Sequence, residues 1–119
     1  MKNKNGYEYF VNRDGICWYN MRGEVPKEYE VKLCEAWIIR FGEKQKTPTT
    51  FKESYGFKHV VERFFNYYIA NGEFIQACLN LGYEIVPSDL NAQVCINVKK
   101  WKKYVAEYNR DNKHSIIYI

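Results

Sequence analysis

The sequence predicts an α+β domain in which a small, mainly antiparallel sheet is covered by a helical hairpin and by a basic C-terminal helix. Strand-like stretches near the N-terminus and after residue 82 are separated and followed by apolar residues at helical spacing. A chain of 119 residues with an apolar fraction of 46% can bury one core without staples. We therefore expect a single domain, 1–119, made of a hairpin and helix in 7–42, a linker in 42–50, and the remaining elements in 51–119.

The first predicted element is a β-hairpin. Its strands run from Tyr7 to Val11 and from Ile16 to Tyr19, and the residues between them are Asn-Arg-Asp-Gly. Asn and Asp tolerate turn conformations and Gly supplies a positive φ, so this connection favours a tight turn.

The next element is a helix that begins near Pro26 and ends before Gly42, because Pro suits a first helical position and Gly often follows a last turn. Its apolar stripe is formed by Leu33, Cys34, Trp37, Ile38 and Phe41. The alternation of Tyr29, Val31 and Leu33 leaves a strand as the alternative. The polar residues that follow, up to Thr50, are expected to form the linker.

The strongest helical periodicity lies in residues 57–68, where Phe57, Val60, Val61, Phe64, Phe65 and Tyr68 recur at steps of three and four. Thr50 or Ser54 is expected to cap this helix. Asn71-Gly72 is predicted to break the pattern before a second helix that ends at Gly82. The two helices would form a helical hairpin.

The C-terminal third is predicted to contain two strands and a helix. The segments "YEIV" and "AQVCINV" are strand-like and are separated by the turn-rich "PSDLN". Asn97 is expected to cap the final helix, whose buried stripe would be Trp101, Tyr104, Val105 and Tyr108. The closing "SIIYI" is expected to dock on a sheet edge.

Several classes of protein lack support in the sequence. It has no apolar run of about 18 residues and no signal-like N-terminal segment, so we expect a cytoplasmic protein without a membrane partner. The four cysteines are far apart and unpaired in sequence, which favours reduced, buried thiols over a disulfide or a zinc site. Phosphate-loop, Rossmann and GxSxG motifs are absent, so we expect no cofactor, no metal and no catalytic residue.

The first candidate site is a basic cluster on the final helix. Lys99, Lys100, Lys102, Lys103 and Arg110 lie within one twelve-residue segment, whereas the acidic residues are spread elsewhere. Four lysines at the positive end of a helix dipole repel one another and the dipole. An anion would relieve that repulsion, so these residues are candidates for binding a partner or phosphates. A solvated basic face is the alternative.

The second candidate is the trio Lys58, His59 and Glu62, whose spacings of three and four place the side chains together on a helix. A carboxylate can orient a histidine that acts as a general base, so a small enzyme using His59 and Glu62 is one hypothesis. The alternative is an outward-facing, solvated set with a Lys-Glu ion pair.

The residues from Ser54 to Ile85 resemble a set of small uncharacterised proteins encoded by phages and mobile elements of low-GC bacteria. The resemblance depends on "SYGFKHVVE", "NGEF" and "GY", with Asn91 before the last strand. It covers about the middle third of the chain. Small phage proteins of this kind commonly bind and block a host defence complex, as anti-CRISPR proteins do.

We therefore expect a non-enzymatic accessory protein that inhibits a host protein or ribonucleoprotein complex through a basic, aromatic surface in the bacterial cytoplasm. Direct binding of DNA or RNA through the lysine-rich helix is the alternative. The oligomeric state, a dimer included, stays open.

Overall fold

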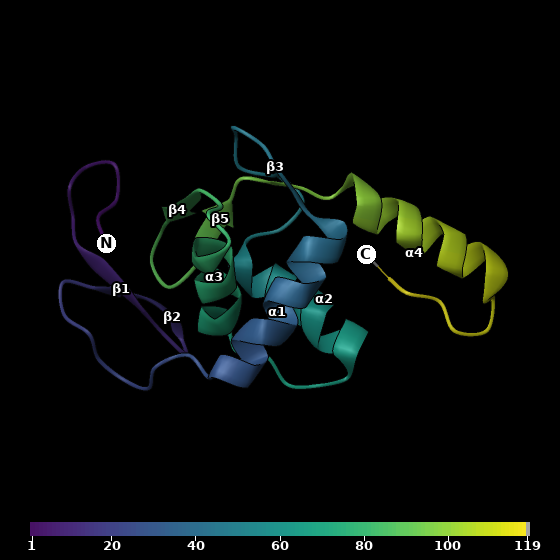
Figure 1. Ribbon diagram of the computed structural model, residues 1–119, viewed down its shortest axis with the longest axis horizontal. Coiled ribbons are helices and arrows are strands. Elements are labelled where there is room, and N and C mark those ends of the chain that lie inside the picture. The colour runs from purple at the N-terminus through teal and green to yellow at the C-terminus, as the bar shows by residue number, and fades with distance from the viewer. Residues whose placement is uncertain (119) are drawn as a thin grey trace.

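The computed structural model describes residues 1–118 and confirms the α+β class (Figure 1). Within these residues the chain forms four α-helices and three two-stranded antiparallel sheets. The strands are thus divided into small ladders and do not form one continuous sheet. The molecule is elongated, with principal extents of 48 × 29 × 20 Å, because the last helix projects at one end and the N-terminal strands lie at the other (Figure 1).

The N-terminal hairpin is confirmed as β1 (Tyr9–Asn12) and β2 (Gly15–Trp18). The side-chain oxygen of Asn12 accepts hydrogen bonds from the backbone N–H groups of Asp14 and Gly15, which closes the turn. Gly15 adopts a φ of +134°, and a Cβ at this position would collide with the carbonyl of Leu90. Glycine is therefore required both by the turn and by the neighbouring loop.

The first helix is confirmed as α1 (Glu28–Phe41), so the alternative of a strand over residues 29–33 is wrong. Its buried face carries Val31, Cys34, Trp37, Ile38 and Phe41. Helical spacing gathers these side chains on one face, whereas a strand would have buried only alternate residues.

The segment predicted as a linker is partly structured. Its first residues form β3 (Glu43–Lys44), which pairs with β6 (Ile96–Asn97). Further along, the backbone N–H groups of Gln45 and Thr49 donate to the carbonyls of Cys95 and Val94. The 43–52 segment therefore runs alongside β5 (Ala92–Val94) and β6, the residues that precede the last helix.

The helical hairpin is confirmed as α2 (Ser54–Phe65) and α3 (Asn71–Asn80), but the predicted break is wrong. The chain leaves α2 at Asn66, which has a φ of 52°, and Asn71-Gly72 form the first turn of α3. Gly72 is needed for close packing, since its N–H donates to the carbonyl of Arg13 and a Cβ would collide with the carbonyl of Asn12.

The capping prediction for α2 is also wrong. Glu53 occupies the cap position and makes no side-chain capping hydrogen bond. Ser54 lies inside the first turn, fully buried, and its hydroxyl oxygen accepts a hydrogen bond of 2.9 Å from the N–H of Ala92. The serine thus joins α2 to the strand β5 (Ala92–Val94).

The C-terminal elements follow the prediction as far as the last helix. β4 (Ile85–Pro87) pairs with β5, and α4 spans Lys99–Asp111. The cap position of α4 is occupied by Val98 and not by the predicted Asn97, whose Oδ1 accepts a hydrogen bond from the Lys99 N–H. Trp101 and Val105 are buried on α4, and Tyr104 and Tyr108 are half-buried.

The predicted docking of residues 115–119 on a sheet edge is wrong for the described residues. No strand forms in 115–118, and the side chain of Asn109 makes two hydrogen bonds with the backbone of Ile117 instead. Residue 119 lies outside the described part of the chain.

One aromatic cluster joins all four helices. The ring centroid of Trp37 lies 6.1 Å from that of Phe57, 6.5 Å from Phe74 and 5.4 Å from Trp101. Each of these rings comes from a different helix, so the core depends on Trp37. The four cysteines are free and buried, as expected, and burial raises the pKa of the Cys34 and Cys78 thiols.

Gly72→Ala is expected to destabilise the protein by about 3 kcal/mol, because the new methyl group must displace the hairpin from the start of α3. Urea denaturation measures this change. Gly56→Ala is the comparison, since its methyl group would come within 3.0 Å of Lys52 Cβ and no closer to any other atom, a contact that a small shift of Lys52 relieves. Alanine also gains up to about 1 kcal/mol over glycine in a helix. Equal stability of the two variants would contradict the close packing at Gly72.

Candidate functional site

The four predicted lysines of α4 lie together, but Arg110 does not join them. Lys99, Lys100, Lys102 and Lys103 are exposed on the first turns of the helix. Arg110 lies seven residues beyond Lys103, about 10 Å further along the helix axis, and its Nε is 3.3 Å from Oδ1 of Asp111. The basic site is therefore concentrated at the start of α4.

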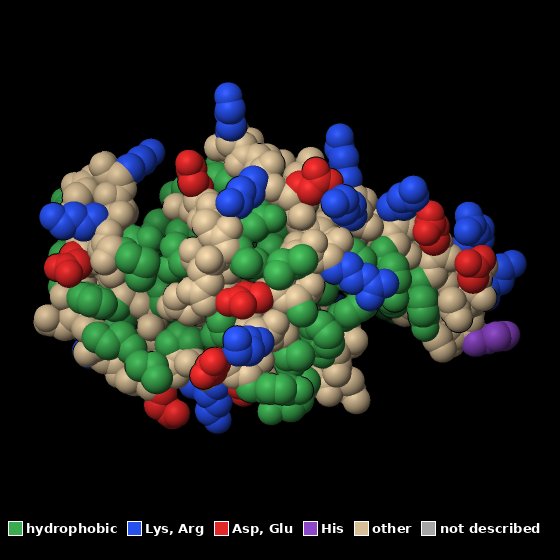
Figure 2. Space-filling view, viewed as in Figure 1, with side chains coloured by type: hydrophobic (Ala, Val, Ile, Leu, Met, Phe, Trp, Pro, Cys, Tyr) green, Lys and Arg blue, Asp and Glu red, His purple; other side chains and the backbone are tan. Residues whose placement is uncertain are grey.

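Lysines of the 43–52 segment enlarge this cluster. Lys102 Nζ and Lys52 Nζ lie 5.2 and 5.0 Å from the ring centroid of Phe51, and Lys100 Nζ lies 3.5 Å from Glu43 Oε1. We call the combined set the lysine surface; it consists of Lys44, Lys46, Lys52, Lys99, Lys100, Lys102 and Lys103. Figure 2 shows Lys and Arg side chains projecting from the region of β3 and along α4.

The lysine surface carries a clear excess of positive charge. Its two segments, 43–53 and 99–103, contain seven lysines and two glutamates, Glu43 and Glu53, and a third glutamate, Glu84, lines a hollow with Lys44 and Lys46. No acidic residue lies in the first turn of α4, so the positive end of the helix dipole adds to the charge of the lysines. The three lysines in 44–52 were visible in the sequence, but the two-residue strand that places them beside α4 was not.

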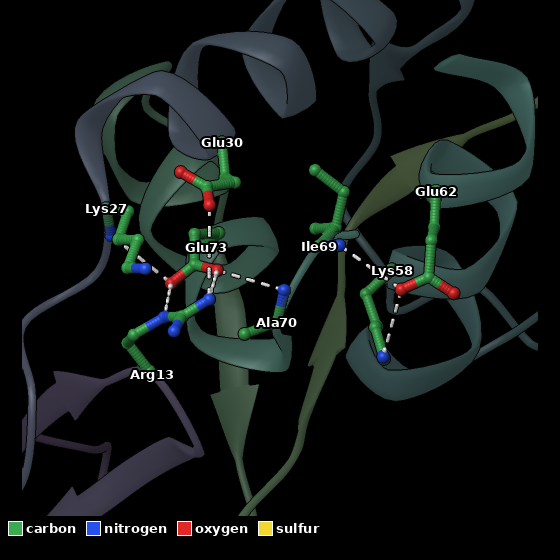
Figure 3. Close-up of polar contacts among 8 residues, drawn as sticks. All are labelled: Arg13, Lys27, Glu30, Lys58, Glu62, Ile69, Ala70 and Glu73. Carbon is green, nitrogen blue, oxygen red and sulfur yellow. Dashed lines mark hydrogen bonds and ion pairs between the residues drawn. The ribbon is translucent and has the colours of Figure 1, made fainter. Parts of the chain in front are cut away.

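The second candidate, the trio on α2, is arranged differently from the expected outward-facing set. The Lys58 side chain is only 6% exposed, and its Nζ lies 3.3 Å from Glu62 Oε1. Glu62 also accepts a hydrogen bond from the Ile69 N–H (Figure 3). Its other oxygen, Oε2, contacts His59 Nδ1 at 3.2 Å. Lys58 is buried because the segment after α2 folds back, so that the Tyr68 ring covers its ammonium group at 4.7 Å.

These contacts change the acidity of Glu62. Burial raises its pKa, but the hydrogen bonds from Ile69, His59 and Lys58 outweigh that effect and leave the pKa below its usual value. Glu62 therefore holds the 66–70 connection against α2 as an ionised carboxylate.

The trio supplies a histidine oriented by a carboxylate, which is one part of a general-base arrangement. His59 is partly exposed, with 34% of its side chain accessible. In the described residues, no hydroxyl or thiol group is hydrogen-bonded to His59, and the nearby Ser54 hydroxyl is occupied with Ala92. A catalytic role for His59 and Glu62 stays a prediction.

A buried ionic cluster that the sequence did not indicate lies at the start of α3. The carboxylate of Glu73, fully buried, accepts hydrogen bonds from the N–H groups of Ala70 and Lys27 and from the guanidinium of Arg13 (Figure 3). Glu30 lies 4.0 Å from Arg13. A glutamate in the first turn of a helix is a known capping signal, but it does not by itself indicate burial.

No helix among residues 1–118 is long and apolar enough to span a membrane. No protein-family model matches the chain, and no curated protein or solved structure gives a significant match. The resemblance to phage and mobile-element proteins therefore stays a prediction, and function must be argued from the surfaces described above.

Glu62→Gln is expected to lower the free energy of unfolding by about 2 kcal/mol at pH 7, because it leaves the buried Lys58 without a charged partner. A folded-state pKa below the unfolded value means that the stabilisation is present above about pH 4.3 and is lost as the pH falls through the folded-state pKa. The difference between wild type and variant should therefore shrink below pH 4, as measured by denaturation from pH 7 to pH 3.

The matched control is Glu107→Gln, which changes an exposed carboxylate on α4. It is expected to leave stability nearly unchanged at every pH. A difference for Glu62→Gln that stays constant from pH 7 to pH 3 would contradict the ionised, hydrogen-bonded state of Glu62.

Proposed function

We propose that the protein acts by binding, not by catalysis, and that its lysine surface contacts an anionic region of a host protein or ribonucleoprotein complex, which is inhibited as a result. The observation that carries this proposal is the position of the 43–52 segment beside the start of α4. Two segments far apart in sequence thereby contribute to one surface with seven lysines and two glutamates.

Two properties suit this surface to a large anionic partner. Most of its lysines are exposed, and the one close ion pair within it, between Lys100 and Glu43, is itself solvent-accessible and so is weak. The half-buried ring of Phe51 between Lys52 and Lys102 adds a flat apolar contact among the charges. Complementary charge of this kind speeds association and selects the partner.

The resemblance of the central segment to phage and mobile-element proteins favours a host defence complex as the target, in the manner of anti-CRISPR proteins. A protein that places its own cations on the anion-bearing face of such a complex would hinder the complex from binding its usual partner. Inhibition of the complex then requires only that the protein occupy this face, without any chemical reaction.

Direct binding of DNA or RNA is the second candidate, and the same observation favours it. Exposed lysines neutralise phosphates, and an aromatic ring among them can stack on a base. The two candidates differ in whether nucleic acid is required for capture of the partner and in whether purified nucleic acid binds at all.

A fourfold charge reversal tests the proposal. Lys46, Lys99, Lys102 and Lys103 are changed to Glu, and the control changes Lys2, Lys4, Lys32 and Lys113 to Glu, which alters the net charge equally at exposed positions elsewhere. The surface variant is expected to lose capture of the host partner from bacterial lysate, whereas the control keeps it, because local charge and not net charge makes the contact.

Nuclease treatment and salt separate the two candidates. Capture that survives nuclease identifies a protein surface. Capture that is lost with nuclease, together with binding of a labelled duplex that weakens about 100-fold between 50 and 200 mM salt, identifies four or so phosphate contacts. Equal loss of binding in the surface variant and the control would contradict a role for the lysine surface.

A further inference from the structure

A hollow of about 370 Å³ lies away from the lysine surface, between the β1–β2 turn, the start of α2 and the segment that enters α3. Its lining includes Arg13, Tyr55, Lys58, Tyr68 and Asn71. The volume is in the range that encloses one small ligand. The proposed function makes no use of this hollow.

The first argument for a ligand is the unused hydrogen-bonding capacity of Lys58. A lysine ammonium group has three donors, and burying it is costly unless they are satisfied. Within residues 1–118 the Lys58 ammonium makes one hydrogen bond, to Glu62, although the side chain is only 6% exposed. Two donors of a buried cation therefore remain for a group in the hollow.

Arg13 supplies a second cation with free donors. Its Nε and Nη2 hold the buried Glu73 carboxylate, and Nη1 makes no hydrogen bond to any described residue. Arg13 Cζ and Lys58 Nζ lie 5.9 and 4.7 Å from the centroid of the same Tyr68 ring. Both cations line the hollow and approach the same tyrosine ring, and Glu73 fixes Arg13 in place.

The remaining lining adds two flat rings and a buried amide. Tyr68 and Tyr55 are largely exposed, and the Lys58 ammonium lies within 5.4 Å of the centroids of both rings. The amide nitrogen of the buried Asn71 donates to oxygens of Asp14, Leu90 and Asn91, which fixes the amide in the wall of the hollow. Its Oδ1 is itself buried and has no partner among the described residues.

The charge around the hollow limits the ligand. Glu62 and Glu73 already pair with the two cations, and Asp14 and Glu24 also line the hollow. A polyanion would be repelled, whereas one oxyanion group could receive the free donors of Lys58 and Arg13.

The geometry points to a binding site for a small molecule that carries one carboxylate or phosphate group next to a flat ring. The oxyanion accepts hydrogen bonds from Lys58 and Arg13, and the ring lies against Tyr68, the ring that both cations approach. Carboxylate and phosphate share this recognition chemistry, so the experiment must separate them.

The test is a titration of ¹⁵N-labelled protein followed by NMR with four simple probes. Benzoate and phenyl phosphate carry both features, acetate carries only the anion, and benzyl alcohol carries only the ring. Benzoate or phenyl phosphate is expected to cause saturable shifts around Lys58, Tyr68 and Ala70 with a Kd of about 1 mM, and acetate and benzyl alcohol should bind about tenfold more weakly or worse. The stronger of the first two probes identifies the oxyanion.

Variants verify the location. Tyr68→Ala changes an exposed ring and Lys58→Met removes the buried charge, and each should weaken binding about tenfold. Tyr7→Ala, an exposed tyrosine outside the hollow, is the control and should bind normally. If Lys58→Met fails to fold, Tyr68→Ala alone decides.

Three results would overturn the proposal. They are the absence of saturable shifts with both ring-bearing anions at about 20 mM, shifts confined to the lysine surface, and binding that Tyr68→Ala leaves unchanged. None of these results depends on whether the lysine surface binds a host partner, so the two proposals fail separately.

Discussion

The buried carboxylate of Glu73 is the constraint on which the arrangement of the N-terminal half depends. It accepts hydrogen bonds from the segment before α1, from the start of α3 and from the β1–β2 turn through Arg13. A fully buried carboxylate without these partners would cost several kcal/mol, so the three segments must meet at one point. The same contact holds Arg13 at the wall of the hollow and brings Gly72 against the hairpin.

The other end of the molecule is organised by apolar packing. Trp37 contacts rings from α2, α3 and α4, and Trp101 anchors the first turns of α4 on that cluster. Because the apolar side of these helical turns faces the core, their lysines point outward. The short β3–β6 ladder then brings the 43–52 segment beside them. The position of the lysine surface is therefore determined by the packing of α4 on the core and by the pairing of β3 with β6.

The helices could be predicted from the sequence because their apolar residues recur at a helical period, as in Val60, Val61 and Phe64. The β3 strand could not, since a two-residue ladder is too short to show alternation. Asn71-Gly72 resembled a turn, but the missing side chain of Gly72 allows the backbone of Asn12 and Arg13 to pack against it. The position of the break between α2 and α3 therefore depends on a tertiary contact, which no local sequence pattern indicates.

The candidate sites were predictable to a different extent. The α4 lysines are exposed, as a charged run on an amphipathic helix indicates, and their neighbours in 44–52 follow only from the fold. Burial of Lys58 depends on the 66–70 connection, which folds back onto α2 where the Ile69 N–H donates to Glu62. Helical spacing identified the Lys58–Glu62 pair but could not show whether the pair is exposed to solvent or covered by a ring such as that of Tyr68.

Lysine footprinting on the complex with the captured partner tests the central claim most directly. Acetylation by a small reagent, read by mass spectrometry, reports the accessibility of each lysine with and without the partner. We predict that Lys46, Lys99, Lys102 and Lys103 become protected while Lys2, Lys4 and Lys32 react as in the free protein. Protection of the second group, with the first group still fully reactive, would contradict the assignment of the binding surface.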